Sequence, residues 1–296
     1  MKRFLVVVLA VSWFAGTALT VRAQDQASSG PPKVLVIYRE TEKYGKHAGH
    51  VKNEVAFAQA FAASKSPGRF LAITAMSGPG EVWFLGLFDS YDAFEKTNKF
   101  DAQSGIQGQL ERLSAQDAEY VSEATQIVAR YDEKSSYGPP VDIAKMRYFE
   151  VTTIRVRSGH NQQWEDLVKL YKATAEKAKL DETDSFFEVR YGAPEGTILI
   201  FTPRESFAQL DAAAGPGSKA FQDALGESGQ KRWAELFEAS VASVRNDLYS
   251  FSPSMSYVPE AWVKGDPSYW KPKAAAAPKA VAPAAKKPAA TPAAKP

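Results

Sequence analysis

Cysteine is absent from all 296 residues of the sequence. Its absence excludes disulfide bonds, a thiol nucleophile, a thiolate metal site and a lipid anchor on an N-terminal cysteine. Histidine is scarce, with three residues in the chain. Histidines therefore cannot form a metal cage of their own unless segments far apart in the sequence meet.

The sequence also lacks the common motifs for nucleotide binding and for hydrolysis. It contains no GxGxxG pattern, no P-loop and no GxSxG elbow, and the glycines of SGPG (77–80) and AGPG (214–217) are typical of turns. We therefore expect no cofactor and assign no catalytic residue. The lack of an assembled nucleophile favours a protein that is not an enzyme.

The formal net charge of +2 conceals a split between the ends and the body of the chain. Residues 1–23 carry three bases and residues 271–296 carry six, and neither segment contains an acid. The remainder holds 27 bases against 34 acids, a net charge of −7. Because nucleic-acid binding depends on neutralising phosphates with basic groups, the acidic body argues against a nucleic-acid partner.

The first 23 residues have the layout of a cleaved secretory signal peptide. A basic start is followed by an apolar centre, and Val21 and Ala23 fit the small-x-small rule for cleavage before Gln24. The alternative is an uncleaved anchor helix, but the apolar run is short for a bilayer and Arg22 interrupts its end. We expect a periplasmic or secreted protein.

The last segment, residues 271–296, consists almost wholly of alanine, proline and lysine. Such a composition cannot recover its ordering entropy by packing, so it predicts a disordered tail. The tail could act as a spacer, or it could make weak contacts with anionic polymers of the cell envelope.

Strand and helix patterns occur twice along the chain in the same order. Each pass reads as a strand, a long helix, a hairpin, further helices and a closing strand-like segment. The predicted segments are 34–40, 45–64, 69–76, 81–88, 90–99, 105–128 and 130–140 in the first pass, and 146–157, 158–179, 185–191, 197–203, 205–213, 219–246 and 251–259 in the second.

Shared landmarks indicate an internal duplication. Gly45 and Gly159 each precede the long helix, and SGPG and GAPEG link the two hairpins. Tyr137 and Tyr257 occupy the same place in the two closing segments. The predicted units are 33–140 and 145–259.

Each predicted sheet has one face covered by its own helices and one apolar face that needs a partner. A second unit in the same chain can supply that partner. The fold class is therefore predicted to be α+β, with two tandem ferredoxin-like units forming one intrachain pseudo-dimeric α/β barrel and the helices outside.

The segment KVLVIYRETEKYGKHAGHVKNEVAFAQAF and the hairpin FLAITAM–SGPG–EVWFLGLF resemble the dimeric α/β-barrel superfamily. Members of this superfamily include the antibiotic-biosynthesis-monooxygenase domains and the NIPSNAP-type proteins. The resemblance lies in the order of elements across both units and includes no diagnostic motif. It implies a barrel made from two units, and it does not imply one activity, since members include monooxygenases, haem-handling enzymes, isomerases and proteins with no known reaction.

Two histidines and a carboxylate share one face of the first long helix. His47, His50 and Glu54 follow three- and four-residue steps, so their side chains could point the same way and bind a metal ion. A structural role or a metal-free polar ligand site are the alternatives. Counting from the two glycines, His50 corresponds to Trp164, which favours a packing position. We therefore predict no metal and keep these three residues as the candidates.

Strand alternation gives a second set of candidates. Leu35 and Ile37 are predicted to share one face of the first strand, and the opposite face, with Val34, Val36 and Tyr38, is predicted to be the inner one and mainly apolar. In the second unit the inner face is predicted to be polar, and such groups need partners or a ligand. A satisfied bridge between a glutamate and Arg190 is the alternative. The candidate ligand-binding residues are Tyr38, Tyr148, Glu150, Glu188 and Arg190.

Two functions remain open from the sequence. The first is an exported small-molecule-binding or accessory protein of the dimeric α/β-barrel type. The alternative is a cofactor-independent monooxygenase-like or isomerase-like enzyme with a carboxylate and arginine site in the barrel. The ligand and the oligomeric state are not predicted.

Overall fold

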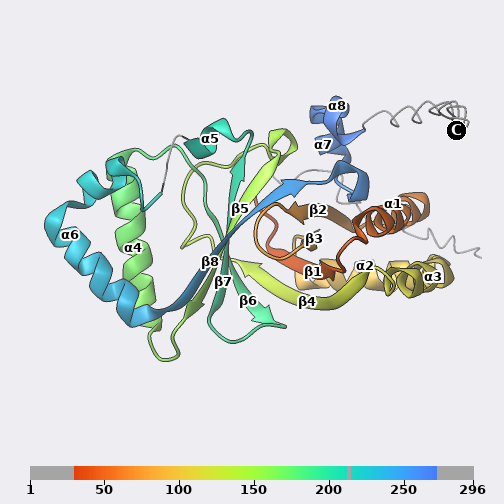
Figure 1. Cartoon of the computed structure of the whole chain (residues 1–296), viewed down its shortest axis with the longest axis horizontal. Coiled ribbons are helices and arrows are strands. Elements are labelled where there is room, and N and C mark those ends of the chain that lie inside the picture. The colour runs from red at the N-terminus through yellow and green to blue at the C-terminus, as the bar shows by residue number, and fades with distance from the viewer. Residues whose placement is uncertain (1–29, 212–214, 272–296) are drawn as a thin grey trace, which may run out of the picture.

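The computed structural model describes residues 30–211 and 215–271, which form a closed barrel of eight strands between two groups of helices (Figure 1). The predicted signal peptide and all of the predicted tail except Lys271 lie outside the described residues. The strands are β1 (Val34–Glu42), β2 (Arg69–Ala75), β3 (Glu81–Phe88), β4 (Val121–Tyr131), β5 (Tyr148–Val156), β6 (Ser185–Tyr191), β7 (Thr197–Arg204) and β8 (Val241–Phe251).

Helices lie on two sides of the barrel (Figure 1). One group is α1 (His47–Ser64), α2 (Tyr91–Gln103) and α3 (Gln107–Asp117), and the other is α4 (Asn161–Ala178), α5 (Ala208–Asp211) and α6 (Lys219–Ser240). Short helices α7 (Glu260–Gly265) and α8 (Pro267–Trp270) follow the last strand, and two 3₁₀ turns span Ile143–Lys145 and Pro253–Met255. Among the described residues, no helix is both long and apolar enough to cross a membrane.

The strand order around the barrel is β1-β3-β2-β8-β5-β7-β6-β4, and every pair is antiparallel. We call residues 34–131 the first half and residues 148–251 the second half. Their strand orders are β4-β1-β3-β2 and β8-β5-β7-β6, and the β2–β8 and β4–β6 pairs join them. The expected α+β class and the expected barrel are confirmed.

The register gives a position-by-position correspondence between the halves. Glu42 pairs with Val121 across a β-bulge, and Val156 pairs with Val241 across a β-bulge in the other half. The segments after β4 and β8 cross to the opposite half: Tyr137 bridges Asp184, and Tyr257 bridges Phe70.

The two long helices begin in the same way. Gly45 has a φ of 76° and Gly159 a φ of 81°, a left-handed conformation that glycine adopts without a steric cost. Each glycine turns the chain away from its strand two residues before the helix starts. The predicted starts of these helices follow from this local chemistry.

The inside of the barrel is an apolar core to which all eight strands contribute. Leu35 and Ile37 point inward, so the prediction that the opposite face of this strand, with Tyr38, lies inside was wrong. Trp83 meets Tyr249 with ring centroids 4.9 Å apart. The remaining buried strand residues of this core are Leu71, Ile73, Leu85, Ile127, Ala129, Phe149, Val151, Phe187, Val189, Leu199, Phe201 and Phe251.

The helix predictions over 105–128 and 219–246 were wrong in their C-terminal parts. The helices end at Asp117 and Ser240, and strands β4 and β8 follow. The β4 segment VSEATQIVARY contains good helix formers, but long-range pairing with β1 and β6 determines its conformation. Both predicted hairpins, β2–β3 and β6–β7, are confirmed.

Candidate functional site

A cavity of about 650 Å³ lies between helices α1–α3 and the outer face of the first half's sheet. We call it the outer cavity. Its volume falls within the range of about 300–1,000 Å³ that is usual for small-molecule sites. Several aromatic side chains line it, and exposed Ser114, Ala118 and Ala124 line it as well. The aromatic residues are Tyr38, Phe57, Phe61, Phe70, Phe84, Phe88 and Phe94.

Four ionisable side chains gather at this cavity. Glu40 comes from β1, His50 and Glu54 from α1, and Asp117 from the last residue of α3. One ligand-type atom from each of them lies within 4.8 Å of the others, and all four residues are buried. Three of them, Glu40, Glu54 and Asp117, line the cavity. We call the four residues the acid–histidine cluster.

His50 is the best-connected member of the cluster. Its side chain has no solvent exposure, its Nε2 lies 2.9 Å from Glu40 and 3.8 Å from Asp117, and its Nδ1 lies 2.8 Å from Glu42. Burial alone would lower the pKa of His50, but the hydrogen bonds to Glu40 and Glu42 and the nearby charges raise it to about 9. The imidazole is therefore positively charged at neutral pH.

Glu54 has the opposite environment. It is 6% exposed, and its carboxyl makes no hydrogen bond or ion pair with any residue that the structure describes. Burial, together with the charges of Glu40 and Asp117, raises the pKa of Glu54 to about 8, so the group carries a proton at neutral pH. Burial and Glu40 also raise the pKa of Asp117, whose Oδ1 accepts a hydrogen bond of 3.2 Å from the Asn53 amide.

The second half has no such cluster at the corresponding positions. By strand register and helix start, Glu40 corresponds to Ile154, His50 to Trp164 and Glu54 to Val168. Asp117 lies four residues before β4 and Phe237 four residues before β8, so these two residues also correspond. Ile154, Trp164 and Val168 pack together with α6 in an apolar core. The contrast between polar and apolar counterparts was visible in the sequence for His50, but Glu40 and Asp117 were missed.

The three predicted metal candidates separate in the structure. His50 and Glu54 join the cluster, whereas the His47 side chain is 60% exposed and its Nδ1 lies 2.9 Å from Glu42. Glu42 therefore contacts both histidines but lies outside the group of four. Tyr38, a predicted ligand-binding residue, lines the outer cavity.

The other predicted ligand-binding residues do not lie inside the barrel. Phe149 and Val151 face the core. Their neighbours Tyr148 and Glu150 alternate with them along β5 and therefore face outward. Tyr148 stacks on Phe207, with ring centroids 4.4 Å apart. The prediction that the second half has a polar inner face was wrong. The polar residues of these alternating strands lie on the outer face, on which the helices pack.

Ion pairs already occupy three of these side chains. Glu150 lies 2.7 Å from the Arg204 guanidinium, and Glu188 lies 2.6 Å from Arg190. Both members of the Glu188–Arg190 pair are more than a third exposed. The predicted alternative of a satisfied bridge therefore describes Glu188 and Arg190.

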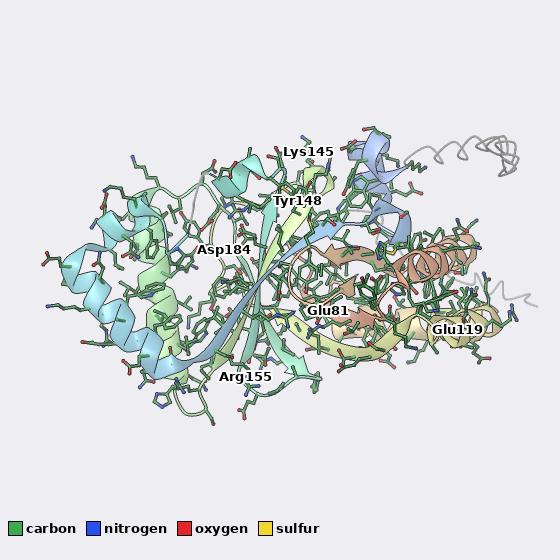
Figure 2. The ribbon with its side chains drawn as sticks, viewed as in Figure 1. Glu81, Glu119, Lys145, Tyr148, Arg155 and Asp184 are labelled. Carbon is green, nitrogen blue, oxygen red and sulfur yellow. The ribbon has the colours of Figure 1, made fainter. Side chains whose placement is uncertain are left out.

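A buried network lies between the second half's strands and α4, where Figure 2 shows Asp184. The Arg204 guanidinium lies 3.1 Å from Glu182, and Asp184 accepts hydrogen bonds from Tyr171 and Thr202. Burial raises the pKa of both Glu182 and Asp184. All of these groups have partners, so the network is a structural one.

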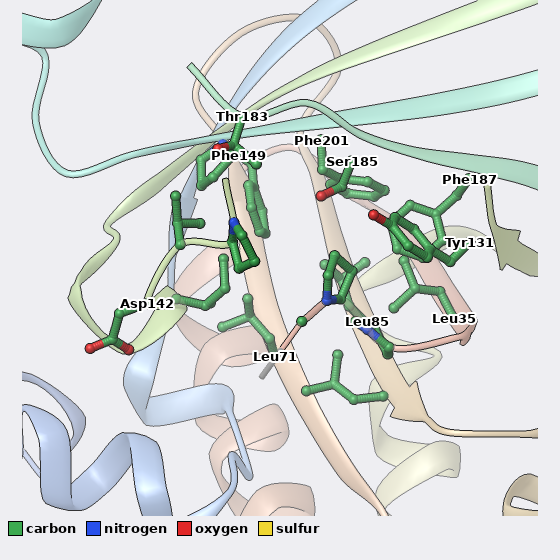
Figure 3. A pocket seen from close by; sticks show the side chains of 18 of the residues that line it. Leu35, Leu71, Leu85, Tyr131, Asp142, Phe149, Thr183, Ser185, Phe187 and Phe201 are labelled. Atoms are coloured by element: carbon green, nitrogen blue, oxygen red, sulfur yellow. The ribbon is translucent and has the colours of Figure 1, made fainter. Parts of the chain in front are cut away.

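A second cavity, of about 450 Å³, lies at one end of the barrel (Figure 3). Its walls are mainly apolar, with Thr183, Ser185 and Asp142 among the few polar residues. The apolar lining residues labelled in Figure 3 are Leu35, Leu71, Leu85, Tyr131, Phe149, Phe187 and Phe201.

The barrel also contains charged groups that the sequence analysis missed. Glu81 lies 3.0 Å from Arg39 and accepts a 2.7 Å hydrogen bond from Trp83 Nε1. Arg245 pairs with Asp247 and lies 3.6 Å from Glu81. Burial would raise the pKa of Glu81, but the hydrogen bond from Trp83 and the charges of Arg39 and Arg245 lower it overall.

No protein-family model and no curated protein matches the sequence. Among solved structures, an anthrone oxidase-like protein has a TM-score of 0.51 at 12% identity, over 76% of this chain and 94% of the other. A candidate monooxygenase from Fusobacterium nucleatum has a TM-score of 0.49 at 11% identity, over 75% and 93%. A chlorite dismutase variant from Candidatus Nitrospira defluvii has 0.41 at 9% identity, over 79% and 95%. The likeness to the anthrone oxidase-like protein supports a dimeric α/β-barrel fold and nothing more.

Proposed function

We propose that this protein binds a small, mainly apolar organic molecule in the outer cavity, with a polar group of that molecule held at the acid–histidine cluster. One observation carries the proposal: an aromatic-lined space of about 650 Å³ meets three buried carboxyl groups. Small-molecule sites combine apolar walls with a few convergent polar groups in this way.

The cluster defines the chemistry of the polar group. At neutral pH, protonated Glu54 can donate a hydrogen bond, while Glu40 and Asp117 can accept one. A hydroxyl, an amine or a neutral nitrogen heterocycle satisfies such a set. A carboxylate or phosphate would face like charges, which disfavours anionic ligands.

Fluorescence titration with the apolar amine N-phenyl-1-naphthylamine tests this proposal. Ala124 pairs with Glu40 on the cavity side, so Ala124→Trp should fill part of the cavity and weaken probe binding at least about ten-fold. Val244 pairs with Ile154 at the corresponding place in the second half. Val244→Trp is therefore the matched control and should leave binding unchanged. Equal binding by both variants would contradict the proposal.

The ligand itself can be identified by native mass spectrometry of protein purified from its own host. A co-purified mass should be present in the unmodified protein and in Val244→Trp, and absent from Ala124→Trp. Retention by all three proteins would place the ligand elsewhere.

An enzyme is the second candidate, because a proton-transfer group faces the cavity. A carboxyl with a pKa of about 8 can give or take a proton near neutral pH, as an isomerase-like or cofactor-independent monooxygenase-like reaction requires. NMR of the identified ligand in deuterated water tests this candidate. If the protein is such an enzyme, an acidic C–H of the ligand should exchange with deuterium in the unmodified protein and not in Glu54→Gln. If the unmodified protein shows no exchange, the enzyme candidate is rejected and the binding function stands.

We also propose that the two halves are tandem ferredoxin-like units that arose by duplication. Their matching strand orders and the crossed Tyr137–Asp184 and Tyr257–Phe70 bridges support this origin. Units bounded at 33–140 and 145–259 contain all eight strands. Kinship with NIPSNAP-type proteins stays a prediction.

Export is proposed from residues 1–23, and weak contact with anionic envelope polymers is proposed from residues 271–296. Intact mass of the mature protein should place its N-terminus at Gln24. Removing residues 271–296 should lower the share that sediments with envelope material, and an unchanged share would leave the tail as a spacer.

A further inference from the structure

We propose that the acid–histidine cluster is a site for one divalent transition-metal ion, held by the carboxylates of Glu40, Glu54 and Asp117 and by Nε2 of His50. The inference rests on the proposed function and concerns the metal-bound form of the same site, in which Glu54 is deprotonated and a polar group of the organic molecule would meet the ion at the polar end of the outer cavity. The metal site nevertheless stands on its own residues and can be tested without an organic ligand.

The donor set is the first argument. Four potential ligand atoms, one nitrogen and three oxygens, already lie within 4.8 Å of one another. An ion with bonds of about 2.0–2.2 Å needs its ligands to approach somewhat closer than this, which small side-chain rotations can provide. Imidazole with carboxylates suits zinc, iron(II) and manganese(II), and it disfavours Cu(I), which prefers sulfur ligands.

Glu54 provides the second, independent argument. Glu54 is a buried residue, 6% exposed, whose carboxyl lines the cavity and has no hydrogen-bond or ion-pair partner among the described residues, so it is free to bind a ligand there. Its oxygen points toward the same centre as those of Glu40 and Asp117. A bound cation would supply the missing partner and would stabilise all three acids in their deprotonated form.

The surroundings of the ligands fit this role. Glu42 lies 2.8 Å from Nδ1 of His50, which can hold the Nδ1–H tautomer and leave the Nε2 lone pair for a metal. Asn53 donates to Asp117 at 3.2 Å and orients that carboxylate. The ligands are carried by a strand and two helices, so the backbone positions are fixed.

Binding must release protons. Coordination needs Glu54 as a carboxylate and Nε2 of His50 without a proton, so any proton on these atoms must leave when the ion binds. The resulting site has three negative charges and a neutral imidazole around a 2+ ion. Affinity should therefore rise with pH.

The second half predicts the stoichiometry. Ile154, Trp164, Val168 and Phe237 occupy the corresponding positions and offer no metal ligand, so one ion per chain is expected.

The test is calorimetric titration of chelator-treated, full-length protein with Zn²⁺ and separately with Mn²⁺, in two buffers of different ionisation enthalpy. We expect one ion per chain, proton release near pH 7, and tighter binding at pH 8. Glu54→Gln keeps the shape and the neutral state of the protonated side chain, so it should fold, as circular dichroism can verify. It should lose at least about ten-fold in affinity.

His47→Ala and Glu150→Gln are the controls, since neither residue belongs to the cluster. Both should bind as the unmodified protein does. The absence of saturable binding, or equal affinity in Glu54→Gln, overturns the metal site. Titration of N-phenyl-1-naphthylamine into metal-free protein separates the two proposals: probe binding without metal binding defeats only the metal site, and the reverse result defeats only the organic-ligand proposal.

Discussion

His50 and Glu40 form a buried pair in which the imidazole Nε2 lies 2.9 Å from the carboxylate and the histidine side chain has no solvent exposure. Each of two buried charged groups stabilises the other, because burying either charge without its partner has a high desolvation cost. The corresponding residues of the other half, Trp164 and Ile154, pack in an apolar core. The barrel therefore does not need charges at this position for its stability, which makes a ligand-binding role the better explanation.

Substituting His50 tests how strongly the cluster depends on this pair. His50→Ala removes the positive charge that faces Glu40 and Glu42, and we expect the free energy of unfolding to fall by about 3 kcal/mol. His47→Ala is the control, since His47 is 60% exposed and its contact with Glu42 contributes less than about 1 kcal/mol. Urea unfolding near pH 7 measures both, and equal losses would contradict the prediction.

The sequence predicted those parts of the fold that local chemistry controls. The glycine before α1, the helical spacing of its apolar residues and the SGPG turn are all short-range signals, and they placed α1 and the β2–β3 hairpin correctly. Strand β4 depends instead on β1 and β6, which are distant in the chain. Its helix-forming residues misled the prediction for that reason.

The candidate site shows the same limit. Helical spacing could place His50 beside Glu54, but nothing local could bring Glu40 from β1 and Asp117 from the end of α3 to the same point. Only the register of β1 with β4 sets that distance. Glu150 was misplaced because an alternating strand identifies two faces without saying which one is inside.

Glu81 is expected to stabilise the inside of the barrel. Glu81→Leu would leave the Arg39 guanidinium without its carboxylate, and the Arg39 Nε already lacks a hydrogen-bond partner. We expect a loss of about 3 kcal/mol in the free energy of unfolding, and recovery of most of it in the double variant Arg39→Met/Glu81→Leu. Thermal and urea unfolding measure these values; additive losses in the double variant would rule out the coupling.

Glu81 also gives an acid-side pH dependence. Its pKa is lower in the folded protein, so its stabilising contribution is full above the unfolded value and is lost as pH falls through the folded one. The unmodified protein should therefore lose this contribution on acidification, whereas Glu81→Leu should not.

Arg204 is expected to be structural. It lies between Glu182 and Glu150 and has a side-chain exposure of 10%, so Arg204→Met leaves buried Glu182 without its cation. We expect a loss of about 3 kcal/mol near pH 7 and a smaller loss at lower pH, because burial raises the pKa of Glu182 and a protonated acid no longer needs the cation. Arg190→Met is the matched control, since the Glu188–Arg190 pair is solvent-exposed and contributes less than about 1 kcal/mol. A loss independent of pH would contradict the argument.

The cluster predicts that metal-free protein becomes less stable as pH rises. The pKa of His50 goes from 6.5 to about 9 on folding and that of Glu54 from 4.5 to about 8, so the folded protein holds more protons than the unfolded chain between these values. Each contribution is full below the unfolded pKa and is lost as pH rises through the folded one. The free energy of unfolding should fall by about 1.4 kcal/mol per pH unit for each proton involved.

Glu54→Gln separates the two contributions. Glutamine cannot titrate, so the variant should lose less stability than the unmodified protein between pH 6 and pH 8, while the His50 contribution persists toward pH 9. Urea unfolding in the presence of a chelator measures both curves. Saturating Zn²⁺ should remove this fall in the unmodified protein, because above the unfolded pKa of His50 both groups are then deprotonated in the folded and the unfolded state alike. Parallel curves for the two proteins would show that Glu54 is already ionised in the folded protein at pH 6. The protonated state assigned to Glu54 would then be wrong.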